Sequence, residues 1–184
     1  MFDCFKKKKQ GLKWGRVICH SLLAEGANTV RADEIVSENR YCRSMYGHMK
    51  IHTDVGTRDI GGLAGAYGHL RGQGCTATIE AHLNAFNGKA SGYEVLCLKG
   101  DKDSMVYAER WLGLMSKHFP DRRNRGTKLL VKGDRGYKNL KESKLNGSKV
   151  ALLTEAFFLD NPKDWIDPEI LSQVFDELIT KEEL

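Results

Sequence analysis

Short apolar runs alternate with segments of helical periodicity along most of the chain. Strand-like apolar runs occupy residues 15–20, 77–82, 93–98 and 149–155, and a weaker one lies at 51–57. Apolar residues recur three and four positions apart, as in amphipathic helices, within residues 38–49, 60–70, 105–115 and 170–179. Strands that alternate with helices predict a layered α/β sheet with helices on both of its faces.

Two stretches depart from this alternation. Residues 21–32 lack apolar periodicity, and we expect a loop there. Residues 121–149 are polar and hold ten lysines and arginines against three acidic residues, a local charge of +7. A segment this long without an apolar pattern is unusual in a compact domain and is often functional. The glycines within residues 60–70 are expected to allow close packing, because no phosphate-binding strand, loop and helix surround them.

Length and charge limit the number of domains and the kind of partner that we expect. Its 184 residues suffice for one domain with a core but not for two comfortable ones. We divide it into a basic N-terminal extension, residues 1–14, and one folded domain, residues 15–184. The net charge of +5 favours an anionic partner such as a cell-wall polymer or a nucleic acid. We interpret Lys6 to Lys9 as a solvated tail, with an electrostatic tether as the alternative.

The cysteines and the apolar content bear on disulfide bonds, membrane insertion and secretion. The five cysteines are scattered, odd in number and without the pair spacing of a zinc motif, so we expect buried free thiols. No stretch approaches the roughly 20 apolar residues of a membrane-spanning helix. The lysine run near the start is not followed by an apolar segment, so we expect no secretory signal.

Candidate chemistry lies at the ends of three expected strands. These strands finish on His20, His82 and Glu155, where α/β proteins place ligand-binding side chains. Glu38 heads the apolar stripe of the first helix, and Glu34 lies one turn earlier as its rival. Two histidines and a glutamate are a common ligand set for catalytic zinc, and a further carboxylate can move protons beside it. The other histidines lack such a setting and are interpreted as structural or surface residues: His48, His52, His69 and His118.

Several longer stretches resemble one enzyme family. They are residues 17–27, 32–38, 79–88, 92–96, 124–128 and 153–162. In these the chain resembles the zinc-dependent N-acetylmuramoyl-L-alanine amidases, most closely the catalytic domains of phage endolysins. The resemblance implies a single three-layer α/β domain with a twisted, mixed and mostly parallel sheet. It also implies cleavage of the amide between the lactyl group of N-acetylmuramic acid and L-alanine of the stem peptide.

The resemblance also assigns roles to residues. One Zn²⁺ would be held by His20, Glu38 and His82, which decides against Glu34, and Glu155 would be catalytic. Substrate binding is expected at Asn84 and Arg125. The chain departs from many members at Cys19, where they have glycine. Its alternate position on the strand is expected to turn the Cys19 thiol away from the metal.

The resemblance leads to expectations about partners and location. We expect a monomer that acts on peptidoglycan, with no nucleic-acid partner and no stable membrane insertion. An endolysin is made in the host bacterial cytoplasm and reaches the wall or periplasm after release, which is consistent with the expected lack of a signal peptide. Two alternatives remain open: another zinc peptidase of cell-wall peptides, and a basic module that binds a polymer or nucleic acid.

Overall fold

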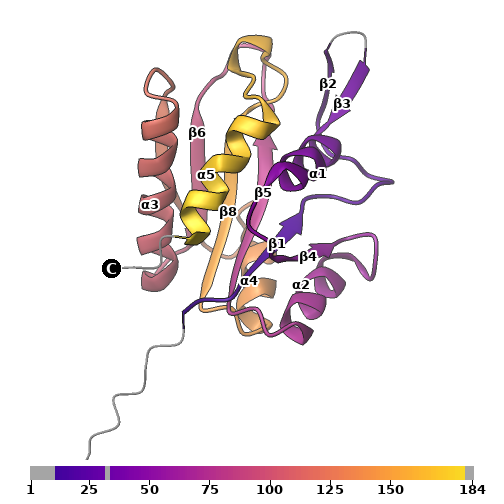
Figure 1. Cartoon of the computed structure of the whole chain (residues 1–184), viewed down its shortest axis with the longest axis vertical. Coiled ribbons are helices and arrows are strands. Elements are labelled where there is room, and N and C mark those ends of the chain that lie inside the picture. The colour runs from indigo at the N-terminus through magenta and orange to yellow at the C-terminus, as the bar shows by residue number, and fades with distance from the viewer. Residues whose placement is uncertain (1–10, 32–33, 181–184) are drawn as a thin grey trace, which may run out of the picture.

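A six-stranded sheet forms the centre of the molecule (Figure 1). The computed structural model describes residues 11–31 and 34–180, so the Lys6 to Lys9 run lies outside the described residues. In spatial order the strands are β4 (Asp54–Thr57), β1 (Trp14–Ile18), β5 (Ala77–Asn84), β8 (Val150–Phe158), β6 (Tyr93–Leu98) and β7 (Asn124–Leu130). Neighbours in the first four strands are parallel, whereas β6 runs antiparallel to β8 and parallel to β7. The sheet is therefore mixed and mostly parallel, as predicted.

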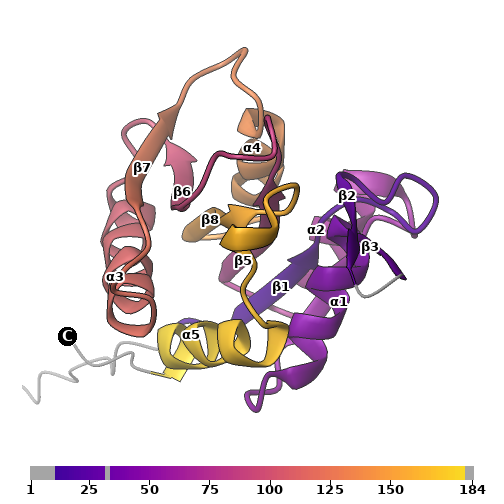
Figure 2. The ribbon, with the colours of Figure 1, turned by 90° about the horizontal axis from the view of Figure 1, so that it is seen from above.

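Helices cover both faces of this sheet (Figure 2). Their bounds are α1 (Glu38–His48), α2 (Gly62–Gly72), α3 (Lys102–His118), α4 (Tyr137–Leu145) and α5 (Pro168–Thr180), with a 3-10 turn at Pro162–Asp164. The larger core lies under α1, α3 and α5, where Trp111, Met45 and Phe175 are fully buried against β5 and β8. On the opposite face α2 packs over Val17 of β1, and α4 packs over Leu153 of β8. The expected three-layer α/β domain is confirmed.

The elements that the sequence pattern missed are short or solvent-facing. Residues 21–32 are not all loop, since β2 (Asn28–Arg31) pairs antiparallel with β3 (Glu34–Ser37) in a separate hairpin. Residues 121–149 do show little apolar pattern, yet they contain both β7 and α4, which the sequence did not predict. Edge strand β7 buries only Leu130, and α4 buries only Leu140 and Ser143. With so few buried positions, neither element produces a recognisable apolar period.

Gly56 of β4 permits close packing of α2 on the sheet, whereas Gly65 permits a close approach within the start of α2 itself. A Cβ atom on Gly65 would lie 1.9 Å from the carbonyl oxygen of Ile60, and one on Gly56 of β4 would lie 2.6 Å from that of Ala66. Any larger residue at either position would force the backbone segments apart. Helix α2 therefore rests directly on the edge of the sheet.

Among the described residues, no helix combines the length and apolar character needed to cross a bilayer.

Candidate metal centre and catalytic carboxylates

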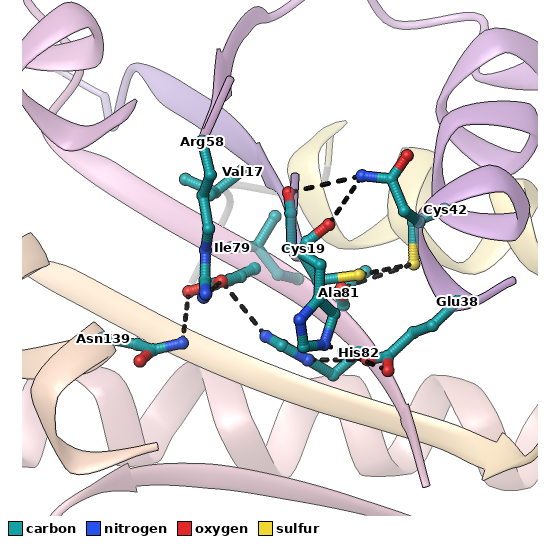
Figure 3. A network of polar contacts seen from close by, with 12 residues as sticks. Val17, Cys19, Glu38, Cys42, Arg58, Ile79, Ala81, His82 and Asn139 are labelled. Atoms are coloured by element: carbon teal, nitrogen blue, oxygen red, sulfur yellow. Dashed lines mark hydrogen bonds and ion pairs between the residues drawn. The ribbon is translucent and has the colours of Figure 1, made fainter. Parts of the chain in front are cut away.

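Four possible metal ligands meet near the carboxyl ends of β1 and β5 (Figure 3). Cys19 and His20 follow β1, Glu38 begins α1, and His82 lies within β5. One donor atom from each lies within 4.8 Å of the others. In the part of the chain that the structure describes, no second group of three or more such side chains converges in this way. The structure thus brings together the three residues that were assigned as zinc ligands.

An unusual backbone conformation presents His20 to this group. Its φ is +56°, and it is the only residue other than glycine with a positive φ among the described residues. The left-handed conformation ends the strand-like alternation of side chains after Ile18, so Cys19 and His20 both reach the site. The expected turning away of the Cys19 thiol is therefore wrong. Its Sγ atom also lies 3.5 Å from Sγ of Cys42.

Glu38 links the two histidines. Its Oε2 lies 3.1 Å from Nε2 of His20, and its Oε1 lies 2.7 Å from Nδ1 of His82. The backbone N–H of Leu83 donates to Oε1 at 3.1 Å. The carboxylate is 1% exposed, and this burial would by itself raise its pKa. The two histidines outweigh the burial and hold the pKa of Glu38 well below its usual range, so the group is an anion at neutral pH.

Local folding explains why Glu38 is held so firmly. It occupies the first turn of α1, where a negative charge is favoured by the exposed backbone N–H groups. Ser37 caps this helix, because its hydroxyl accepts a hydrogen bond from the N–H of Arg40 at 3.2 Å. The backbone of Gly26 packs against both side chains: a Cβ atom there would lie 2.5 Å from Cδ2 of His20 and 2.6 Å from Oε2 of Glu38, so only glycine fits. The sequence analysis missed Gly26, since a lone glycine in an unpatterned segment gives no signal.

This donor set fits a zinc ion. Two imidazole nitrogens and a carboxylate oxygen form a ligand set that catalytic zinc commonly uses, with another position kept for water. Nε2 of His20 is buried and has no hydrogen-bond partner of acceptable geometry in the described structure, although it lies close to Glu38. A buried nitrogen without a hydrogen bond is costly unless a ligand occupies its lone pair. The His20 Nε2 atom is therefore left without a hydrogen bond at the place where a metal would bind.

Glu155 lies beside the candidate metal ligands. In the parallel pairing of β5 with β8, it is the register partner of His82. Both side chains line a cavity of about 150 Å³, together with His20, Arg58 and Asn139. Strand β8 continues to Phe158 and β5 to Asn84, so Glu155 and His82 stand inside their strands and not at the expected strand ends. The predicted proton-transfer residue nevertheless shares one cavity with both histidines.

A second buried carboxylate adjoins Glu155. Glu94 of β6 pairs with Glu155 across the antiparallel register, and it is 1% exposed. Burial and the negative charge of Glu94 raise the pKa of Glu155 to about 7. Burial opposes ionisation of Glu94 too, but Lys128 at 2.5 Å and Arg125 at 2.9 Å lower its pKa to about 2. The pKa values of the two carboxyl groups therefore differ widely, and such a difference allows paired acids to take different catalytic roles.

The two residues expected to bind substrate both contact Glu94. Nδ2 of Asn84 donates to its Oε1 at 2.9 Å, and Nε of Arg125 donates to its Oε2 at 2.9 Å. They also line a second cavity of about 340 Å³ with Phe86 and Phe158. Their expected role in substrate binding stays a prediction. Their contacts in this structure point to a different task, since Arg125 neutralises the anion that neighbours Glu155 and Asn84 holds it by a hydrogen bond.

Replacing Glu94 should change the titration of Glu155. In Glu94→Gln the negative neighbour is lost while Lys128 and Arg125 remain, and both changes favour the ionised form of Glu155. We expect its pKa to fall by on the order of one unit. Carbon-13 NMR titration of the metal-free protein would measure this fall. Glu169→Gln, which removes an exposed carboxylate on α5, should leave the value unchanged, and a rise in the Glu94 variant would contradict the assignment.

Three further polar residues of the cavity escaped the sequence analysis. Arg58 and Asn139 both contact Glu80, a fully buried carboxylate two positions before His82 on the same strand. Arg135 is exposed at the rim and forms no hydrogen bond or ion pair with any described residue. Glu80, which does not line the cavity, was missed as well, because a single glutamate inside an apolar strand does not indicate its distant partners. The other four histidines do not join the site, and His118 instead contacts Glu177 at 2.6 Å.

Comparisons with known proteins find relatives in structure only. No protein-family model matches the chain, and no curated protein matches it. The catalytic domain of the CD27L endolysin targeting Clostridia difficile is 26% identical with a TM-score of 0.68, covering 94% of this chain and 99% of that one. N-acetylmuramoyl-L-alanine amidase AmiC2 of Nostoc punctiforme is 16% identical with a TM-score of 0.72, covering 92% and 96%.

A longer protein contains the same fold. Cwp6 from Clostridium difficile matches with 19% identity and a TM-score of 0.71 over 93% of this chain, which spans only 28% of the length of that chain. The structural neighbours thus include an N-acetylmuramoyl-L-alanine amidase and the catalytic domain of an endolysin, and the present chain shares their fold.

Proposed function

We propose that the protein is a zinc-dependent N-acetylmuramoyl-L-alanine amidase, which hydrolyses the amide between the lactyl group of N-acetylmuramic acid and L-alanine. The observation that carries this proposal is the convergence of His20, Glu38 and His82 beside a cavity that also holds Glu155. The fold shared with amidase catalytic domains supports it, as does the 26% identity to an endolysin catalytic domain over nearly the whole chain.

The residues divide the chemistry between them. His20, Glu38 and His82 would hold the zinc, which when bound polarises a carbonyl group and makes water nucleophilic near neutral pH. Glu155 takes the proton that water loses as its oxygen attacks the lactyl carbonyl carbon. It then passes this proton to the alanine nitrogen as the carbon–nitrogen bond breaks, which leaves a free amine and a lactyl carboxylic acid that ionises by giving its proton to the amine or to solvent. With a pKa of about 7, Glu155 can both accept and return a proton near neutrality.

Product analysis tests the reaction. Purified sacculi incubated with the protein should gain new amino termini on L-alanine, and they should keep their D-alanine. Loss of D-alanine without new L-alanine termini would identify a carboxypeptidase in place of an amidase. If neither product forms while the protein binds zinc, the wall peptide is not its substrate.

We also propose that the protein serves as an endolysin, made in the host cytoplasm and acting on the wall after release. The support is its likeness to the catalytic domain of an endolysin. A basic surface beside the cavity suits an anionic wall polymer. Arg125 and Lys128 form ion pairs with Glu94 and contribute little to this surface. Its positive charge comes from exposed side chains around the start of α4: Lys132, Arg135, Lys138 and Lys141.

This basic surface should make activity on intact walls depend on salt. Hydrolysis of sacculi should fall several-fold between about 50 and 300 mM salt, because screening shortens the reach of exposed charges to about 10 Å or less. Hydrolysis of a small soluble muropeptide should barely change. The variant Lys132→Gln/Lys138→Gln/Lys141→Gln should lose most of this salt dependence.

A matched control lies elsewhere on the surface. Lys99 and Lys102 are exposed at the start of α3, and neither lines the cavity. The variant Lys99→Gln/Lys102→Gln should keep the salt dependence of the unmodified protein. An equal response of sacculi and soluble muropeptide would show that the charge around α4 has no steering role.

A further inference from the structure

Glu80 is a buried charge that the proposed mechanism leaves unexplained. It is 0% exposed and lies on β5, two residues before His82. An ionised carboxylate removed from water costs several kcal/mol unless charged or hydrogen-bonding partners surround it. An apolar residue would fill this position at no such cost. A carboxylate beneath the metal site therefore requires an explanation.

Four side chains surround the Glu80 carboxylate, and three of them, Arg58, Asn139 and His82, are labelled in Figure 3. Arg58 forms an ion pair with Oε1. The hydroxyl of Tyr67, on α2, donates to Oε2 at 2.8 Å, and Nδ2 of Asn139, on α4, donates to the same oxygen at 3.1 Å. Nε2 of His82 lies 3.1 Å from Oε1. Two of these partners come from the two helices on this face of the sheet, and the other two come from β5 and the segment after β4, so the carboxylate has little freedom to move.

The two nitrogens of His82 face different carboxylates. Nδ1 lies 2.7 Å from Glu38, which also contacts Nε2 of His20, so Nδ1 is the nitrogen on the side of the other metal ligands. Nε2 faces Glu80 on the opposite side of the ring. A neutral imidazole carries its hydrogen on one nitrogen and its free lone pair on the other. A hydrogen on Nε2, donated to Glu80, leaves the Nδ1 lone pair for a metal.

We infer that Glu80 is a positioning residue that fixes the ring orientation and the tautomer of His82 for zinc. The inference rests on the proposed zinc site. Carboxylates that accept the second N–H of a metal-bound histidine stiffen the ring and increase its basicity as a ligand. Arg58, Tyr67 and Asn139 hold the carboxylate in place for this contact. In this arrangement Arg58 does not bind substrate, because its charge is committed to Glu80.

Zinc affinity, measured without substrate, separates this role from a structural one. Apo protein would be titrated with zinc against a chromophoric chelator, and folding would be followed by circular dichroism. Glu80→Gln keeps the shape but removes the negative charge, and it should weaken zinc binding by about 10- to 100-fold. Glu80→Asp keeps a charge near Arg58 but withdraws the carboxylate from Nε2 of His82, so it should also weaken binding while disturbing the fold less.

Glu94→Gln is the matched control. Glu94 is likewise a buried glutamate that pairs with basic residues on the same sheet, but none of its hydrogen bonds or ion pairs reaches a metal ligand. This variant should keep the zinc affinity of the unmodified protein within about threefold. If Glu80→Gln or Glu80→Asp folds and also retains that affinity, Glu80 serves only the fold and the inference is overturned.

One measurement needs no variant at all. Long-range nitrogen-15 NMR spectra of the zinc-loaded protein should show hydrogen on Nε2 of His82 and metal on Nδ1. The opposite tautomer would overturn the inference even if every Glu80 variant failed to fold. If the unmodified protein binds no zinc, the proposed function fails as well. If it binds zinc and only the Glu80 results disagree, the inference about Glu80 fails and the proposed function is unaffected.

Discussion

Removing the metal from the purified protein should abolish amide hydrolysis, and added zinc should restore it. A catalytic metal supplies several kcal/mol of transition-state stabilisation, and each 1.4 kcal/mol is a factor of ten in rate, so the loss should exceed about 10³-fold. The same loss is expected for His20→Ala and for His82→Ala. Each variant deletes one of the two imidazole ligands, and zinc content should fall with activity.

Zinc content and turnover measured on the same samples would check this expectation. His118→Ala is a suitable control, because that histidine contacts Glu177 and lies outside the metal centre. It should keep its zinc and most of its activity, even where it loses some stability. Full activity of the unmodified protein after exhaustive chelation, with no metal detected, would contradict the zinc mechanism.

Glu155→Gln should separate catalysis from metal binding. The variant cannot accept the proton of water, and turnover should drop by roughly 10²- to 10⁴-fold, the usual contribution of a positioned acid or base. Its fold and zinc content should stay near normal, because Glu155 is not in the group of converging ligand atoms. Glu38→Ala should show the opposite pattern in zinc content, since it removes the anion that contacts both histidines.

Zinc stoichiometry and rate measured side by side for these two variants provide the check. A Glu155 variant that loses its zinc, next to a Glu38 variant that keeps it, would reverse the two roles. The pH dependence gives a second criterion. Because the pKa of Glu155 is raised to about 7, it is increasingly protonated below that pH, so proton acceptance and activity should fall as the solution is acidified.

The sequence predicted the parts of this molecule that bury regular apolar faces. Strand β5 buries seven consecutive residues and β8 buries eight of nine, and both were recognised. The buried stripe of helix α1 was also recognised, because Glu38 heads a pattern that continues through Cys42 and Met45. The hairpin of β2 with β3, strand β7 and helix α4 bury too little to show a period. Tertiary contacts that the local sequence does not encode fix them in place.

The candidate site divides in the same way. His20, His82 and Glu155 were noticed because they interrupt apolar strands, and the family resemblance selected Glu38 over the exposed Glu34. Glu80 and Glu94 each lie between two apolar residues of a strand, where a glutamate alone predicts no partner. Their partners come from segments distant in the chain, such as Arg58, Asn139 and Lys128. Only the folded arrangement shows that these carboxylates are held in place.

The left-handed backbone at His20 has an evolutionary consequence. A residue with a Cβ atom is destabilised in this conformation by roughly 1–2 kcal/mol relative to one without it. A glycine there would relax the backbone and remove a proposed zinc ligand, so among metal-free proteins the more stable one would be the one that cannot hold zinc. Selection for thermal robustness alone would therefore drift away from function at this position. Directed evolution of hardier variants should hold position 20 fixed and seek its gains elsewhere in the fold.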